Sequence, residues 1–262
     1  MSALTFLPEL AGRWFLRWLH GTGIVGLVLI RTLRQLFHLN RREYMRGLLH
    51  FGWDSLGIAL WVAVVIGAMV VVQSGLYVNR FGARLFLGWA AAFAVIWEFG
   101  PLLLGLVMAA RVGARNAAEL SSLQTGGQLE GLRGISLDPF AVLVAPRVLA
   151  IVTSMGCLAM LTFVVAIAIE IIAAYFTLGL PIRVFRESVA ASLGWQDAVA
   201  GLIKTLFFGL AIATVSTAVG MRAHGGARAV GRTAGAAVVW AALSIFSLDL
   251  LLTPILARML AR

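Results

Sequence analysis

The sequence predicts an all-α integral membrane protein with about five transmembrane helices, preceded by a helix that lies in the membrane interface. Apolar residues make up 61% of the 262 residues and charged residues only 12%, which is about half the charged share of a soluble domain. The mean hydropathy is +0.97. In addition, five separate runs contain the roughly 20 predominantly apolar residues that are needed to cross the hydrocarbon core.

The five runs are expected to be helices. The hydrocarbon core offers no hydrogen-bond partner to an open strand edge, and these runs are too long and too uniformly apolar for barrel strands. We expect residues 1–50 to form an N-terminal amphipathic interfacial region and residues 51–262 to form one five-span domain. The spans are expected at about 55–79, 85–110, 148–176, 198–221 and 233–257.

The arginines predict the orientation of these spans. They account for 20 of the 21 basic residues, and a cytoplasmic N-terminus places fourteen of them inside and six outside, in agreement with the positive-inside rule. We therefore expect a cytoplasmic N-terminus and, after five spans, an external C-terminus. The net charge of +10 is then explained by topology and by contact with anionic headgroups, and not by binding to nucleic acid.

In residues 1–50, aromatic and aliphatic side chains are interleaved with arginines. Trp14 and Trp18, for example, lie close in sequence to Arg13 and Arg17. Such a pattern is typical of a helix in the membrane interface, with its guanidinium groups directed towards lipid phosphates. The alternative is a first span that is too short to cross.

The longest polar stretch, residues 111–147, separates the second and third spans. It is too short to fold as an independent domain. Residues 116–123 predict a short helix, and the pair Gly126-Gly127 is expected to end it.

Four ionisable residues fall inside the predicted spans, where an unpaired charge is costly: Glu98, Glu170, Lys204 and Asp249. A structural role is the simpler interpretation for three of them. Lys204 is expected to pair with an acid on a neighbouring span, and Glu170 and Asp249 are expected near a membrane face. Glu98 differs because the helix-breaking pair Gly100-Pro101 follows it, and irregular backbone at depth is tolerated where it lines a cavity. Glu98 is thus the best candidate for a substrate site.

Several chemistries have no support in the sequence. There is no Gly-rich loop that ends in Gly-Lys-Ser or Gly-Lys-Thr, so no P-loop for ATP is expected in this chain. The four histidines have no metal-ligand spacing to one another or to Cys157. No serine lies in a Gly-x-Ser-x-Gly turn. We therefore expect no catalytic residue, no metal and no enzyme activity.

A set of short motifs resembles the MlaE/YrbE-type permeases, which work with MCE-domain proteins in ABC transporters of lipids. The resemblance extends from about Asp54 to the C-terminus, and no single piece of it is specific. Its order and spacing carry it, through Glu98-Phe99-Gly100-Pro101, Ala110-Arg111-Val112-Gly113, Ala117-Ala118-Glu119-Leu120, Gln128, Asp138-Pro139, Pro146-Arg147-Val148-Leu149-Ala150, Lys204, Phe208-Gly209, Gly220, Gly225-Gly226-Ala227, Val230-Gly231 and Thr233, with Gly67 and Gln73 in the first span.

The resemblance implies a non-catalytic permease subunit in a bacterial inner membrane. It would move phospholipid or a related lipid between that membrane and an MCE-type periplasmic partner, in support of outer-membrane lipid asymmetry. A separate ATPase would bind the ATP, so no cofactor is expected here, and a second copy of the permease would complete a homodimer. The C-terminus would then be periplasmic, and residues 111–147 would form the segment that couples to the ATPase.

The resemblance also suggests site residues. Those expected at the lipid are Gln73, Tyr77, Trp97, Glu98 and Phe99, and those expected at the ATPase are Arg115, Glu119, Leu120 and Gln128. Trp97 departs from the family pattern, which usually has arginine at this position, and Gly127 stands where glutamate is usual. A tryptophan makes the pocket less positive, which favours a different headgroup or a less polar lipid.

Two other functions are compatible with the residues alone. One is an ion- or proton-coupled secondary transporter in which Glu98, Lys204 and Asp249 form the relay. The other is a membrane scaffold with no transport role.

Overall fold

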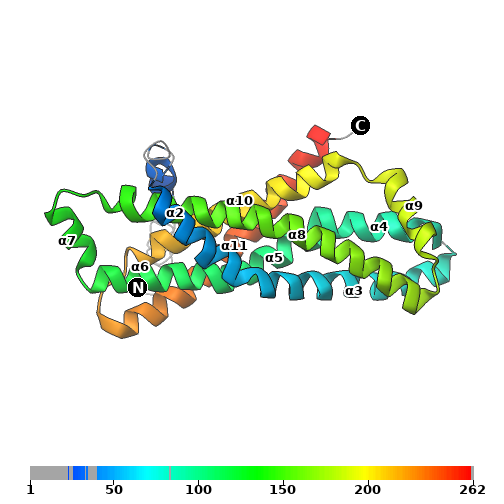
Figure 1. The fold of residues 1–262 in the computed structure, drawn as a ribbon, viewed down its shortest axis with the longest axis horizontal. Helices are drawn as coiled ribbons and strands as arrows, with labels where there is room; N and C mark the ends of the chain where they lie inside the picture. Colours follow the sequence, from blue (N-terminus) through cyan, green and yellow to red (C-terminus); the bar gives the residue numbers. More distant parts are fainter. Residues whose placement is uncertain (1–22, 24–25, 33, 35–39, 83, 261–262) are drawn as a thin grey trace, which may run out of the picture.

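The computed structural model of the chain describes residue 23, residues 26–32, residue 34 and residues 40–82 and 84–260. These residues form an elongated bundle of helices that run roughly along one axis (Figure 1). Within the described ranges, five helical segments are long and apolar enough to cross a membrane, and no strand is present. The predicted fold class is confirmed. Residues 1–22, on which most of the predicted interfacial helix falls, lie outside the description.

The helical run that contains the first span begins at Arg41, before the span start that we expected near residue 55. Helix α2 (Arg41–Gly47) continues through a π-helical turn (Leu48–Gly52) and a short 3₁₀ turn into α3 (Leu56–Phe81). Two glycines let this segment lie against the third span: a Cβ on Gly47 would lie 2.7 Å from Ala150 Cβ, and one on Gly52 would lie 2.7 Å from Ser154 Oγ. Residues 41–50 therefore pack on the bundle as the start of the first spanning segment.

The second span and the first part of the polar stretch after it form one long helical run from residue 84 to residue 125. It consists of a 3₁₀ turn (Arg84–Phe86), α4 (Leu87–Ala94), a π turn (Val95–Phe99), α5 (Gly100–Met108), a second π turn (Ala109–Gly113) and α6 (Ala114–Thr125). Helix α6 ends at the glycine pair, as predicted, and Gly127 has the left-handed φ of 70° that starts the separate helix α7 (Gln128–Gly134).

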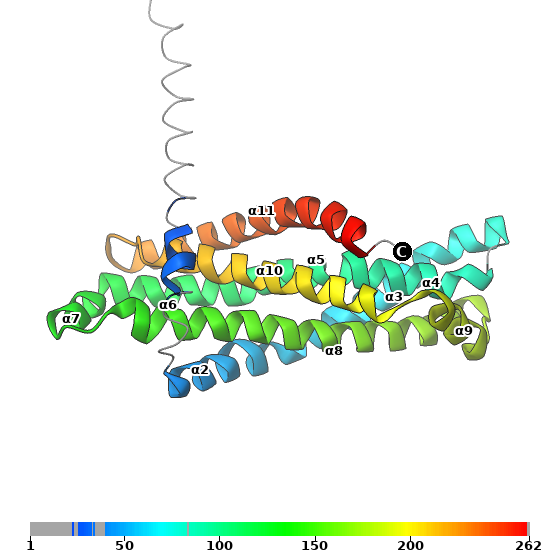
Figure 2. The ribbon, with the colours of Figure 1, turned by 90° about the horizontal axis from the view of Figure 1, so that it is seen from above.

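The remaining helices complete the bundle. After a π turn (Phe140–Val144) come α8 (Ala145–Leu178), α9 (Ile182–Ser192), α10 (Trp195–Gly220) and α11 (Gly226–Leu260). Figure 1 places α6 and α7 at one end of the bundle and α9 at the other. In Figure 2, α11 lies along one side of the bundle and α2 along the opposite side.

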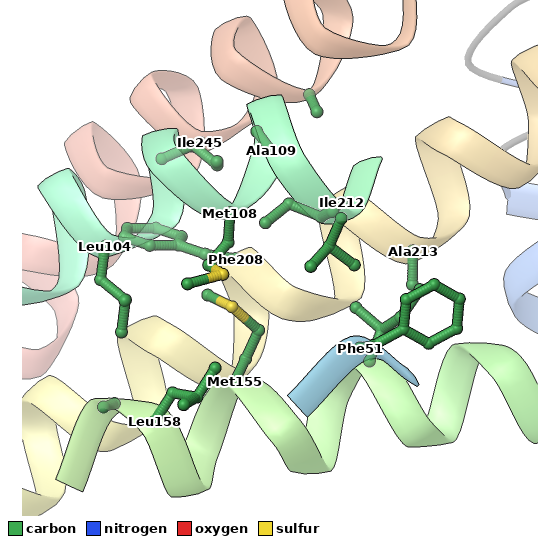
Figure 3. Packing of buried hydrophobic residues seen from close by; sticks show 14 of the residues in the cluster. Phe51, Leu104, Met108, Ala109, Met155, Leu158, Phe208, Ile212, Ala213 and Ile245 are labelled. Carbon is green, nitrogen blue, oxygen red and sulfur yellow. The ribbon is translucent and has the colours of Figure 1, made fainter. Parts of the chain in front are cut away.

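The interior joins α5, α8 and α10. Figure 3 shows Met108 of α5 and Met155 of α8 directed towards each other, with Phe208 of α10 beside them, and all three side chains are buried. Small residues bring the helices close: a Cβ on Gly209 of α10 would lie 3.0 Å from Met155 Cβ. Such a close approach is expected for helices that gain stability from tight packing in lipid.

Candidate functional site

The site begins at a break in the second span. Residues 95–99 form a π-helical turn, and Pro101 follows at the start of α5. A proline has no backbone N–H, so it cannot donate to the carbonyl four residues earlier, which belongs to Trp97. That carbonyl is thus available to another partner, and the side chain of Lys204 takes it, with Nζ donating to Trp97 O at 2.7 Å.

Lys204 lies on α10 with its side chain fully buried. Its ammonium nitrogen lies within 3.0 Å of three oxygen atoms: Trp97 O at 2.7 Å, Asp249 Oδ1 at 2.8 Å and Glu98 Oε2 at 3.0 Å. Hydrogen bonds form to Trp97 and Glu98, whereas the contact to Asp249 is an ion pair without hydrogen-bond geometry. An ammonium has three N–H donors, and each has an oxygen nearby.

The two acids come from different helices. Glu98 lies in the π turn and Asp249 on α11, so Lys204 ties three spans together. The predicted pairing of Lys204 with an acid on a neighbouring span is confirmed, twice over. Asp249 was expected near a membrane face; in the structure its side chain is 17% exposed and faces Lys204.

Glu98 is the member of this cluster that remains accessible. Its side chain is 38% exposed, compared with 0% for Lys204. Its second oxygen, Oε1, lies 3.2 Å from the hydroxyl of Thr253, one turn beyond Asp249 on α11. Thr253 was missed by the sequence analysis, because a threonine in an apolar run is unremarkable; the only signal is its spacing of four residues from Asp249.

The side chain of Trp97 contacts a third carboxylate, that of Asp197. Its indole Nε1 donates to Asp197 Oδ1 at 2.9 Å, and Asp197 Oδ2 accepts from the backbone N–H of Gly194, which caps α10. On the other side, Trp97 stacks on Phe93 with ring centroids 5.4 Å apart. The tryptophan is 7% exposed, so it helps to form the wall of the site and fixes the start of α10.

The other residues predicted at the lipid are Phe99, Gln73 and Tyr77. Phe99 is adjacent to Glu98 and is 36% exposed. Gln73 and Tyr77 lie on α3 with exposed side chains, and no polar contact joins either of them to Glu98 or Lys204 within the described part of the chain. The structure therefore brings together Trp97, Glu98 and Phe99, while a lipid-binding role for Gln73 and Tyr77 stays a prediction.

A second charged cluster lies where α6 meets the start of the first span. Glu119 is its centre: His50 Nε2 lies 2.6 Å from Glu119 Oε1, and Arg147 Nη1 lies 3.0 Å from Oε2. Arg115 contacts both Glu119, at 3.5 Å, and Asp54, at 3.2 Å. Next to the cluster is a cavity of about 470 Å³ that Glu43, Arg46, His50, Glu119 and Arg147 help to line.

The four residues predicted at the ATPase occupy different environments. Arg115 and Glu119 are partly exposed within this cluster, and Gln128 is exposed at the start of α7. Leu120 is fully buried and packs near Gly220 of α10, so it anchors α6 to the bundle and offers no surface to a partner in this conformation. No group of histidine, cysteine or acidic residues suited to a metal ion occurs among the residues that the structure describes.

Comparison with known proteins places this geometry in context. Residues 44–255 match the family described as Permease MlaE. A probable ABC transporter permease of Rickettsia typhi is 29% identical over 254 residues, which cover 96% of this chain and 98% of that protein. One from Synechocystis is 30% identical, covering 89% of this chain and 88% of its own length. The chloroplastic protein trigalactosyldiacylglycerol 1 of Arabidopsis thaliana is 30% identical and covers 88% of this chain, which spans 65% of that protein.

Proposed function

Because the chain belongs to the MlaE permease family, we propose that it is the non-catalytic membrane subunit of an ABC transporter that moves phospholipid or a related lipid. In this proposal a separate ATPase supplies the energy. An MCE-type protein in the periplasm exchanges the lipid with the inner membrane, and the N-terminus of the permease is cytoplasmic.

One observation supports the proposal that lipid binds at Glu98. Glu98 is a partly exposed carboxylate beside a buried lysine, at a break in a spanning helix. Irregular backbone and ionisable side chains at membrane depth are found where they line a cavity or a substrate path. The name of the Arabidopsis relative contains that of a glycolipid, which also supports a lipid substrate for this chain.

A second permease copy is the partner we propose in the membrane. Helix α11 is the least covered of the five spans, with 17% of its most apolar stretch buried, compared with 39–61% for the other four. Its exposed side includes Trp240, Leu243, Phe246, Leu250 and Leu251. Since α11 also carries Asp249 and Thr253, pairing through this helix would place the Glu98 cluster near the interface of a homodimer.

The proposed ATPase contact is the end of the bundle that carries α6 and α7. Glu119 connects α6 to both the first and third spans through His50 and Arg147. A displacement of α6 by the ATPase would therefore also move these two spans. Conformational coupling needs such a contiguous set of contacts between the sites.

Two measurements test the proposed function. The purified protein should bring down an ATPase subunit, and lipid transfer from proteoliposomes of that complex should require ATP. The variant Glu119→Arg should lower ATP-dependent transfer, whereas Glu187→Arg, an exposed residue on α9 at the other end of the bundle, should not. If no ATPase is recovered, or if Glu119→Arg leaves ATP hydrolysis and transfer unchanged, the proposal is wrong.

An ion- or proton-coupled secondary transporter is the second candidate, because Glu98, Lys204 and Asp249 do form one contact cluster. Lipid flux driven by an imposed pH gradient, in vesicles that contain the permease and no ATPase, would favour this alternative. Absence of flux under those conditions, with ATP-dependent flux in the full complex, would exclude it.

A further inference from the structure

The charges around the site are not balanced by protein groups alone. The acidic side chains Glu98 and Asp249 share the single ammonium of Lys204. Trp97, the residue next to Glu98, brings no charge, and its indole donates to another carboxylate, that of Asp197. The groups that surround the site therefore include more acid than base.

Lys204 is not available to a ligand. Its side chain is fully buried, and three oxygen atoms lie within 3.0 Å of its ammonium nitrogen. An anionic phosphate from a lipid would have to displace Glu98, Asp249 or the Trp97 carbonyl to reach it. Recognition of a negatively charged headgroup by this lysine is thus disfavoured.

Glu98 has the opposite properties. Its side chain is accessible, and its Oε1 competes with another acceptor for one donor. The Thr253 hydroxyl lies 3.2 Å from Oε1 but only 2.8 Å from the carbonyl oxygen of Asp249. A hydroxyl has one hydrogen to donate, and the shorter contact is the better bond. An accessible carboxylate oxygen without a firm donor favours a ligand that brings a donor with positive charge.

We infer that the site selects lipids whose headgroup ends in a primary ammonium, as in an aminoethyl phosphate headgroup, with the ammonium bound by the Glu98 carboxylate. This inference rests on the proposed lipid transport function. The ammonium would complete the charge balance of the two carboxylates that share Lys204, and its N–H groups would supply the missing donor. A quaternary choline headgroup has the charge but no N–H, and a glycerol headgroup has hydroxyl donors but leaves a net negative lipid.

The test is a competition between headgroups. The full chain is placed in nanodiscs that contain equal parts of phosphatidylethanolamine, phosphatidylcholine and phosphatidylglycerol with identical acyl chains, and native mass spectrometry identifies the lipid that stays on the protein. We expect about tenfold enrichment of the ethanolamine lipid over the glycerol lipid, the effect of one charge-assisted hydrogen bond, with the choline lipid in between.

Variants connect the enrichment to the residue. Glu98→Gln keeps the size of the side chain and removes its charge, so the enrichment should fall to near unity, whereas Glu187→Gln, a surface carboxylate on α9, should retain it. Retention of all three lipids in equal amounts, or enrichment of the glycerol lipid, would overturn the inference and leave the proposed function intact. If the wild-type protein retains no lipid of any kind, the lipid site of the proposed function fails instead. Should Glu98→Gln fail to fold, the wild-type competition alone decides.

Discussion

The ammonium of Lys204 hydrogen-bonds the backbone carbonyl of Trp97 at 2.7 Å, and this carbonyl is free because Pro101, four residues later, has no N–H to give it. The break in the second span and the buried lysine of the fourth span therefore act together. The proline leaves the Trp97 carbonyl without a helical donor. Lys204 donates to that carbonyl and also to the carboxylate of Glu98, which it holds in place.

Restoring the missing N–H should disturb this arrangement. In Pro101→Ala, the backbone of residue 101 competes with Lys204 for the carbonyl of Trp97. We expect ATP-dependent lipid transfer to fall while the thermal unfolding temperature in detergent is unchanged or higher, because alanine is the better helix former. Pro181→Ala is the matched control, since Pro181 is the N-cap of α9, where an N–H lacks a helical partner in any case. Normal transfer by Pro101→Ala would contradict the role we assign to the proline.

Removal of the lysine charge should strongly destabilise the folded protein. Lys204→Met leaves Glu98 and Asp249 close together without their shared cation, and loss of one partner of a buried ion pair costs about 3–5 kcal/mol. Adding Asp249→Asn should recover part of that loss, because it removes one of the two stranded charges. Chemical or thermal unfolding of the single and double variants measures the recovery. If the double variant is no more stable than Lys204→Met, the unpaired charge of Asp249 does not cause the loss of stability.

Close helix packing at Gly67 gives a stability prediction that is independent of the charges. A Cβ at this position would lie 3.2 Å from Ala166 Cα on α8, and still closer to the carbonyl oxygen of that residue. Gly67→Ala should therefore lower the unfolding temperature. Gly57→Ala, on the same helix with open space around it, should be neutral or stabilising by up to about 1 kcal/mol. Equal effects of the two substitutions would mean that α3 and α8 are not in close contact there.

Glu170 is a buried acid with no function in this account. It is fully buried on α8, and neither of its side-chain oxygens has a hydrogen-bond partner within the described residues. An unsatisfied buried polar group costs about 1–3 kcal/mol, so Glu170→Leu should stabilise the protein. Glu187→Leu, at an exposed site, should change stability by about 0.5 kcal/mol or less. Strong destabilisation or loss of transfer in Glu170→Leu would show that the acid has a partner or a role.

The spans were predictable because hydropathy is a local property. The residues at which the helical segments begin and end were harder to predict. Helix α6 continues the second spanning segment without a break, but the arginines from position 111 onwards lower the hydropathy and hide this continuity. Likewise, residues 41–50 carry several arginines and resemble an interfacial segment, although their small residues Gly47 and Gly52 fit them against α8.

The centre of the site was partly predictable. Glu98 was found because an acid and a Gly-Pro pair are both unusual inside an apolar run. Its partners Asp249 and Thr253 lie on another helix, 151 and 155 positions later in the chain, and only the packing of α11 brings them near. Glu170 shows a related limit: its position along a span does not reveal which side of the helix faces the bundle, and the structure buries it.

The most direct test of the central claim is ATP-driven lipid transfer by the complete transporter in proteoliposomes, compared between the wild type and Glu98→Gln. Our account predicts transfer that requires ATP and the ATPase subunit, and a marked loss of transfer in Glu98→Gln although the complex still assembles and unfolds at a similar temperature. Transfer that continues unchanged in an assembled Glu98→Gln complex would contradict the account, because the lipid path would then lie elsewhere.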